Sequence, residues 1–221
     1  MNAKRRLVSE TLFFVALLAG CTTTTTENGN YNITDAKPDS ILDSKLRKLE
    51  EDTVKYPLRA DLHYEIASLH AKKGECRESA KALERAIQLA PEEAKYHFHL
   101  GRVFLSMSDL SAAEKKFRDA AKLSREGRYT GPRAALGWTL SLKKDVDGAI
   151  AEFGKCVEID PGNPVFYFFL GSLHDMKGDR EPAIHNLREY LARGGVTYRK
   201  KTSDILRSLG VDLEEDLGVG R

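Results

Sequence analysis

The chain has 221 residues, of which 41% are hydrophobic and 31% charged, and its mean hydropathy is −0.43. This composition suits one domain or an elongated repeat array and excludes a polytopic membrane protein. The formal net charge of +2 comes from residues 1–20, so the rest of the chain is neutral, which argues against a nucleic-acid-binding protein. The 3 cysteines are too few for a disulfide scaffold.

The N-terminal residues have the pattern of an export signal. The basic residues 4–6 precede an apolar run at 12–19, which is shorter than the ~20 residues that a membrane-spanning helix needs. Residues 1–20 are therefore expected to form a signal peptide.

The apolar run ends in the sequence Leu-Ala-Gly-Cys at 18–21. This sequence resembles the lipobox of bacterial lipoproteins, which implies a lipid on Cys21 and cleavage of the signal just before it. Several acyl chains would anchor the protein stably to a membrane. An ordinary secretory signal with a chance cysteine is the alternative. Thr22 follows the cysteine; in a host like the enteric Gram-negative bacteria, that residue implies the outer membrane, facing the periplasm.

Two segments separate this signal from the main body of the chain. Residues 21–37 are rich in Thr and Asn and contain few apolar residues, so we expect a disordered tether. Residues 38–59 carry Leu42, Leu46 and Leu49 at helical spacing, which predicts an N-terminal capping helix of a degenerate half repeat.

Residues 60–197 contain a repeated pattern. Four segments of 34 residues align, at 60–93, 94–127, 130–163 and 164–197. Each has an apolar residue at its seventh place and a small residue at its eighth, namely Ala67, Gly101, Gly137 and Gly171. The pattern resembles the tetratricopeptide repeat, a unit of two antiparallel helices. The resemblance implies an all-α fold, a right-handed superhelical array of helix-turn-helix repeats.

The turns and ends of the array can also be placed. Gly74 and Gly178 are expected at left-handed helix ends, and Asp109, Asp145 and Asp179 at the starts of second helices. The second repeat has Arg125 at its closing proline place, so the junction with the third repeat should be less regular. A C-terminal capping helix is expected at 198–210 and an acidic flexible tail at 211–221.

The sequence carries no catalytic or cofactor signature, so we expect neither an enzyme nor a bound metal or cofactor. Four histidines fall at packing places of the repeats: His63, His70, His97 and His174. We interpret them as core residues instead of metal ligands. Cys76 and Cys156 lie in different repeats and are interpreted as buried thiols.

The family resemblance also implies a concave groove lined by first helices, in which a peptide or a partner helix binds. Its places in this chain are occupied by Tyr64, Phe98, Arg102, Leu105, Trp138, Phe168 and Met176, with Ser68, Ala134, Leu142, Ser172 and Asp175. The carboxylate clamp of some family members is not expected here, because only Arg102 among these residues is basic. An aromatic stripe instead favours an apolar segment. The alternative is that the aromatic residues at the fifth place only pack the core.

Two functions fit these observations. The first is a membrane-anchored, non-enzymatic scaffold that binds protein partners during assembly of cell-envelope complexes. It would resemble the lipid-anchored tetratricopeptide proteins of pilus secretin (pilotin-type) assembly, outer-membrane assembly or the control of wall hydrolases, and the sequence does not choose among these. The alternative is a periplasmic chaperone or carrier that transiently shields an exported apolar segment or a ligand. The partner, the host lineage and the oligomeric state are not encoded in any motif.

Overall fold

The computed structural model describes residues 38–124 and 129–212. The expected signal peptide, the lipidation site Cys21, the tether and the acidic tail beyond residue 212 lie outside this part. Ten helices and no strand occur in the described residues. None of these helices is both long and apolar enough to cross a membrane.

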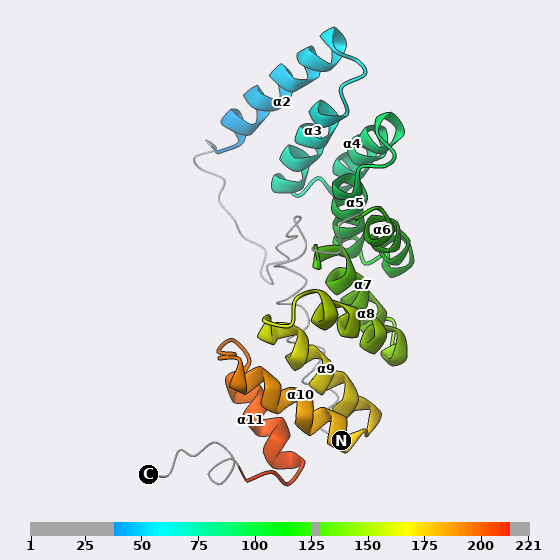
Figure 1. The fold of residues 1–221 in the computed structure, drawn as a ribbon. Helices are drawn as coiled ribbons and strands as arrows, with labels where there is room; N and C mark the ends of the chain where they lie inside the picture. Colours follow the sequence, from blue (N-terminus) through cyan, green and yellow to red (C-terminus); the bar gives the residue numbers. More distant parts are fainter. Residues whose placement is uncertain (1–37, 125–128, 213–221) are drawn as a thin grey trace. The chain divides into compact units, whose positions relative to one another are not determined.

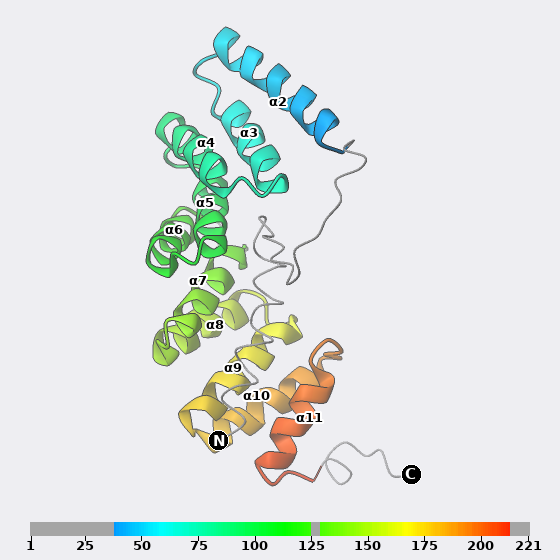
Figure 2. The same cartoon turned by 180° about the vertical axis from the view of Figure 1, so that it is seen from behind.

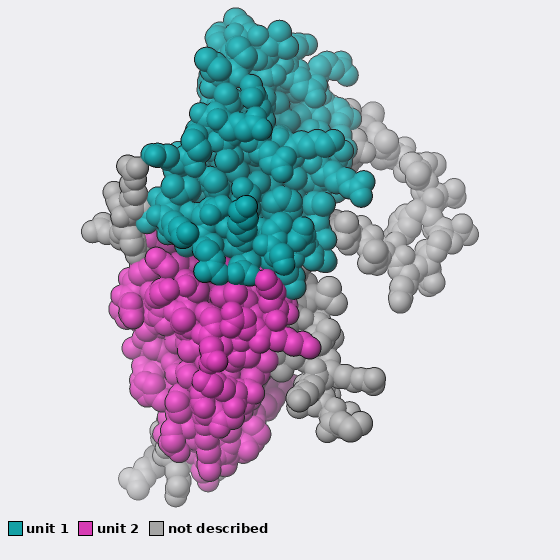
Figure 3. All heavy atoms as spheres, turned by 90° about the vertical axis from the view of Figure 1, so that its right-hand side faces the viewer, with its two compact units in different colours: residues 1–124 teal, residues 125–221 magenta. Residues whose placement is uncertain are grey.

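The chain divides into two compact units, residues 1–124 and 125–221, coloured separately in Figure 3. The boundary falls at the junction where Arg125 replaces the expected proline. The first unit contains α2 (Pro38–Lys55), α3 (Ala60–Lys72), α4 (Cys76–Leu89), α5 (Ala94–Ser106) and α6 (Leu110–Leu123). The second contains α7 (Gly131–Leu142), α8 (Val146–Ile159), α9 (Pro164–Lys177), α10 (Arg180–Ala192) and α11 (Arg199–Ser208).

Successive helices within each unit form hairpins. The pairs are α3 with α4 and α5 with α6 in the first unit, and α7 with α8 and α9 with α10 in the second. Figures 1 and 2 show α2 beside α3, on the side away from α4, and α11 beside α10. The all-α array of helix-turn-helix repeats predicted from the sequence is confirmed.

The small residue at the eighth place lets the two helices of a hairpin pack closely. A Cβ atom built on Gly101 would lie 2.7 Å from ring atoms of Phe117, a completely buried side chain. A Cβ on Gly171 would lie 2.6 Å from Cγ of Leu187 and 3.1 Å from its backbone nitrogen. Because real Cβ atoms do not approach this closely, glycine at these places sets the distance between the helices.

The helix ends follow most of the sequence expectations. Gly74 and Gly178 have φ values of +78° and +89°, as expected for left-handed helix ends. The Asp109 and Asp145 side chains each accept a hydrogen bond from a backbone N–H of the helix that follows, at 3.0 Å. Asp179 also stands at the N-cap of α10, as expected, but its carboxylate makes no capping hydrogen bond and instead lies 3.2 Å from Nδ1 of His174.

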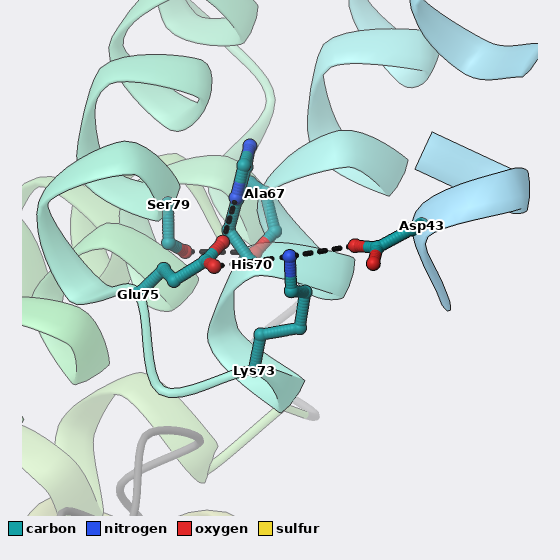
Figure 4. A network of polar contacts seen from close by, with 6 residues as sticks. All are labelled: Asp43, Ala67, His70, Lys73, Glu75 and Ser79. Atoms are coloured by element: carbon teal, nitrogen blue, oxygen red, sulfur yellow. Dashed lines mark hydrogen bonds and ion pairs between the residues drawn. The ribbon is translucent and has the colours of Figure 1, made fainter. Parts of the chain in front are cut away.

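A polar network fixes α2 and α4 to the end of α3 (Figure 4). The Lys73 Nζ lies 2.8 Å from Oδ1 of Asp43 on α2 and 3.0 Å from Oε1 of Glu75. The other oxygen of Glu75 lies 2.6 Å from Nδ1 of His70. The hydrogen bond to Asp43 raises the pKa of Lys73. The hydrogen bond to His70 lowers the pKa of Glu75. These ion pairs thus stabilise the turn between α3 and α4 and connect α2 to it.

The same arrangement recurs in the second unit. The Lys177 Nζ lies 2.8 Å from Oδ1 of Asp147 on α8 and 3.6 Å from Oδ2 of Asp179. His174 contacts that same carboxylate oxygen. Helix α2 therefore holds the position relative to α3 that α8 holds relative to α9. His63, His70 and His174 are only partly buried, and His70 and His174 make this polar link, whereas His97 is buried as expected of a core residue.

Candidate partner-binding surfaces

The first helix of each repeat carries the side chains that the sequence assigned to a binding groove. The structure separates these residues into buried and accessible ones. Phe98, Leu105 and Phe168 are only 9%, 3% and 3% exposed. Their rings and methyl groups fill the space between neighbouring helices, so they offer little surface to a partner. The alternative that the aromatic residues at the fifth place pack the core describes Phe98 and Phe168.

The remaining assigned residues retain accessible surface. Met176 is 52% exposed. Side chains of intermediate exposure are Tyr64, Ser68, Arg102, Ala134, Trp138, Leu142, Ser172 and Asp175. Burial raises the pKa of the Asp175 carboxyl above its ordinary value. All of these residues except Ala134 and Asp175 fall on two surfaces, one in each unit.

The surface of the first unit is formed by α2, α3 and α5, and we call it the α2–α3–α5 surface. Its members are Lys45, Lys48, Tyr64, Ser68, Lys72, His99 and Arg102. A hollow of about 190 Å³ lies between α3 and α5, and one of about 480 Å³ lies between α2 and α3. Both hollows are lined by Tyr64, Ser68 and Lys72, so they adjoin along α3.

Tyr64 and His99 meet at the centre of the α2–α3–α5 surface. The Tyr64 hydroxyl oxygen and the His99 Nε2 lie 3.0 Å apart and share a hydrogen bond. Burial, followed by the nearby charges of Arg102 and Lys95, lowers the pKa of His99 to about 4. The imidazole is therefore neutral at pH 7. The Lys95 ammonium lies 5.7 Å from the centre of the Tyr64 ring, within the range of a cation–π interaction.

The surface of the second unit is aromatic, and we call it the α7–α9 surface: Trp138, Leu142, Phe169, Ser172 and Met176. The Trp138 and Phe169 rings lie 5.6 Å apart, and Phe169 stacks on the Phe153 ring at 4.9 Å. Leu142 follows Trp138 by four residues, and Ser172 and Met176 follow Phe169 by three and seven, so each set shares one helix face. The surface thus presents an indole and a thioether.

In the described ranges, metal binding and thiol reactivity depend on where the His, Cys, Asp and Glu side chains lie. Within residues 38–124 and 129–212, no group of three or more His, Cys, Asp or Glu side chains is placed to hold a metal ion. Burial raises the pKa of the Cys156 thiol to about 12, so it is a poor nucleophile. Of the two thiols expected to be buried, Cys156 is buried, whereas Cys76 is only partly buried.

Sequence reasoning missed several residues of these surfaces. His99 and Phe169 occupy the sixth place of their repeats, directly after the fifth place that was assigned to the groove. On a helix, the sixth place lies beside the ninth and the thirteenth, so a wider stripe would have included it. Lys45 and Lys48 lie on α2, outside the four repeats, and only the packing of α2 on α3 brings them to this surface.

Comparison with known proteins defines the class of this fold. Tetratricopeptide repeat models match residues 64–128 and 133–163. The chain therefore contains tetratricopeptide repeats, which are generally non-catalytic scaffolds, and the fold suggests protein–protein interaction. No curated protein sequence matches the chain.

Several solved structures share the fold. A crystal structure of MamA is 20% identical with a TM-score of 0.65, and covers 79% of this chain and 99% of its own. MamA from Desulfovibrio magneticus is 16% identical with a TM-score of 0.62, and covers 69% of this chain and 85% of its own. The Pseudomonas aeruginosa protein PilF is 15% identical with a TM-score of 0.63, and covers 83% of this chain and 87% of its own. At these identities the likeness concerns the fold.

Proposed function

We propose that the protein is a lipid-anchored, non-enzymatic scaffold of the cell envelope that binds protein partners through its first helices. The observation that carries the proposal is the α7–α9 surface, where Trp138 retains accessible area against Phe169 and Met176 is exposed. Tryptophan is enriched among the residues that contribute most to binding energy, and methionine adapts to irregular apolar partners.

The anchoring part of the proposal rests on the sequence. Lys-Arg-Arg at 4–6, the apolar run at 12–19 and Leu-Ala-Gly-Cys at 18–21 support a cleaved signal and a lipid on Cys21. We place the protein at the outer membrane, facing the periplasm, because Thr22 follows the cysteine. Pilus or outer-membrane assembly is the setting that this combination of anchor and repeats favours.

The binding surface is tested by capture of partners from cross-linked host envelopes. The Trp138→Ala/Met176→Ala variant is compared with the wild type and with Val196→Ala, a control whose side chain is 76% exposed outside the surface. We expect the wild type and the control to recover one partner in fixed stoichiometry, and the variant to recover about tenfold less. Circular dichroism checks that the helices of each variant are intact.

Equal recovery by the Trp138→Ala/Met176→Ala variant would show that the partner binds elsewhere. The anchor is tested separately by Cys21→Ser, which should move the protein from the membrane fraction to the soluble fraction without changing its helicity. A Cys21→Ser protein that stays in the membrane fraction after its signal is cleaved would refute the lipid anchor. Recovery of many partners in variable amounts would favour the chaperone or carrier.

A further inference from the structure

The α2–α3–α5 surface has a chemistry that differs from the apolar groove expected from the sequence. Four basic side chains line its two hollows: Lys45, Lys48, Lys72 and Arg102. The hollows contain only two acidic residues, Asp52 and Glu65. We propose that this surface is a separate binding site for an extended acidic segment of a partner protein. The inference deepens the proposed scaffold function, on which it rests, by stating the chemistry of one partner.

The three lysine charges of the surface are available to a partner. In the part of the chain that the structure describes, no ion pair involves Lys45, Lys48 or Lys72. The nearby Asp43, which could have neutralised one of them, is bound instead by Lys73 at 2.8 Å. The network of Figure 4 therefore removes an acidic group from the surface while it holds α2 in place.

The shape of the surface favours an extended segment over a compact ligand. The hollow between α2 and α3 and the hollow between α3 and α5 adjoin along Tyr64, Ser68 and Lys72. Cations lie in both, with Lys45 and Lys48 on α2 and Arg102 on α5. Carboxylates spaced along one peptide could contact both groups. Leu49, which is partly exposed, also lines the larger hollow and provides apolar contact for the peptide between its charges.

The neutral groups of the surface suit carboxylates. The Tyr64 hydroxyl, the Ser68 hydroxyl and the His99 imidazole lie beside Arg102 in the smaller hollow. Hydrogen bonds from neutral groups orient a carboxylate that the cation attracts. Asp52 and Glu65 would repel a continuous phosphate backbone, whereas a peptide can place its carboxylates away from them. The site also differs from the carboxylate clamp of other family members, because two of its cations come from α2, outside the four repeats.

The test uses the Cys21→Ser chain and a fluorescein-labelled octapeptide of alternating Glu and Ala, amidated at its C-terminus. Binding is followed by fluorescence anisotropy at low salt. The Lys45→Gln/Lys48→Gln variant is compared with Arg77→Gln/Lys81→Gln, which removes the same charge from the exposed face of α4. We expect saturable binding, about five- to tenfold weaker in the α2 variant and within about twofold of wild type in the α4 control. An octapeptide of Lys and Ala should not bind.

Three results would overturn the proposal: no saturable binding, equal weakening by the two double variants, or tighter binding of a single-stranded oligonucleotide than of the acidic peptide. The second would show that only the net charge matters, and the third that the surface prefers phosphate. The outcome is independent of the α7–α9 surface. If the peptide fails to bind while envelope capture still depends on Trp138, the acidic site is refuted and the scaffold function stands.

Discussion

The glycines at the eighth place allow the packing of three of the four hairpins to be tested. Replacing glycine by alanine in a helix interior favours folding by about 1 kcal/mol. Overpacking a filled core opposes folding by about 1–3 kcal/mol. The balance depends on what the added methyl group meets. At Gly171 it meets Cγ and the backbone nitrogen of Leu187, at 2.6 and 3.1 Å. At Gly137 it meets only the ring of Phe153, at 3.0 and 3.1 Å.

Gly171→Ala should therefore lower the free energy of unfolding by about 1–2 kcal/mol, because neither a backbone atom nor a branch carbon can move alone. Gly137→Ala should change it by less than about 0.5 kcal/mol, because a ring edge can shift by a few tenths of an ångström and the gain in helix propensity offsets the strain. The assay is urea unfolding of the Cys21→Ser chain, followed by circular dichroism and by the fluorescence of Trp138, which reports on the second unit. The reasoning is refuted if Gly171→Ala is as stable as wild type while Gly137→Ala is not.

Three further predictions concern other residues. The His99 pKa of about 4 lies below the unfolded value of 6.5, so the unfolded state takes up a proton first on acidification. The free energy of unfolding should therefore fall as the pH drops from 6.5 to 4, by about 1 kcal/mol at pH 5 after allowance for partial exposure. In urea titrations, His99→Gln should make the free energy of unfolding depend less on pH over this range. Lys144 has a φ of +66°, so Lys144→Gly should raise the urea midpoint by relieving about 0.5–1 kcal/mol of backbone strain; a lowered midpoint would contradict this. The pKa of the Cys156 thiol is about 12, so in the Cys21→Ser chain only Cys76 should react promptly with a disulfide reagent at pH 8. Mass spectrometry of the labelled peptides would identify which cysteine has reacted.

The repeat architecture could be predicted from the sequence because its signal is redundant. A small residue, alanine once and glycine three times, recurs at the eighth place in four segments, and each instance has one local cause, the close approach of two helices. Gly74 and Gly178 likewise report a local backbone conformation that few other residues tolerate. Features with local causes, repeated several times, can be read without knowing how neighbouring repeats pack.

The binding surfaces were less predictable because they depend on contacts between repeats. Tyr64 and Phe98 occupy the same place in successive repeats, yet Phe98 is buried and packs near Phe117, whereas Tyr64 keeps accessible surface beside His99. The difference arises from the neighbouring helix, which periodicity within one helix does not describe. The basic character of the first unit was missed for a similar reason, since Lys45 and Lys48 belong to a helix that no repeat pattern includes.

The placement of α2 has a mechanical consequence. In the described residues α2 packs chiefly against α3, and the Asp43–Lys73 ion pair joins the two near the beginning of α2. If the chain is held at its N-terminus, tension enters the fold at Pro38 and reaches α3 through this ion pair and the leucines of α2. Pulling from that end should therefore detach α2 first and dismantle the α2–α3 hollow before any hairpin opens. A partner seated in that hollow would be released by stretching, while the α7–α9 surface stayed folded.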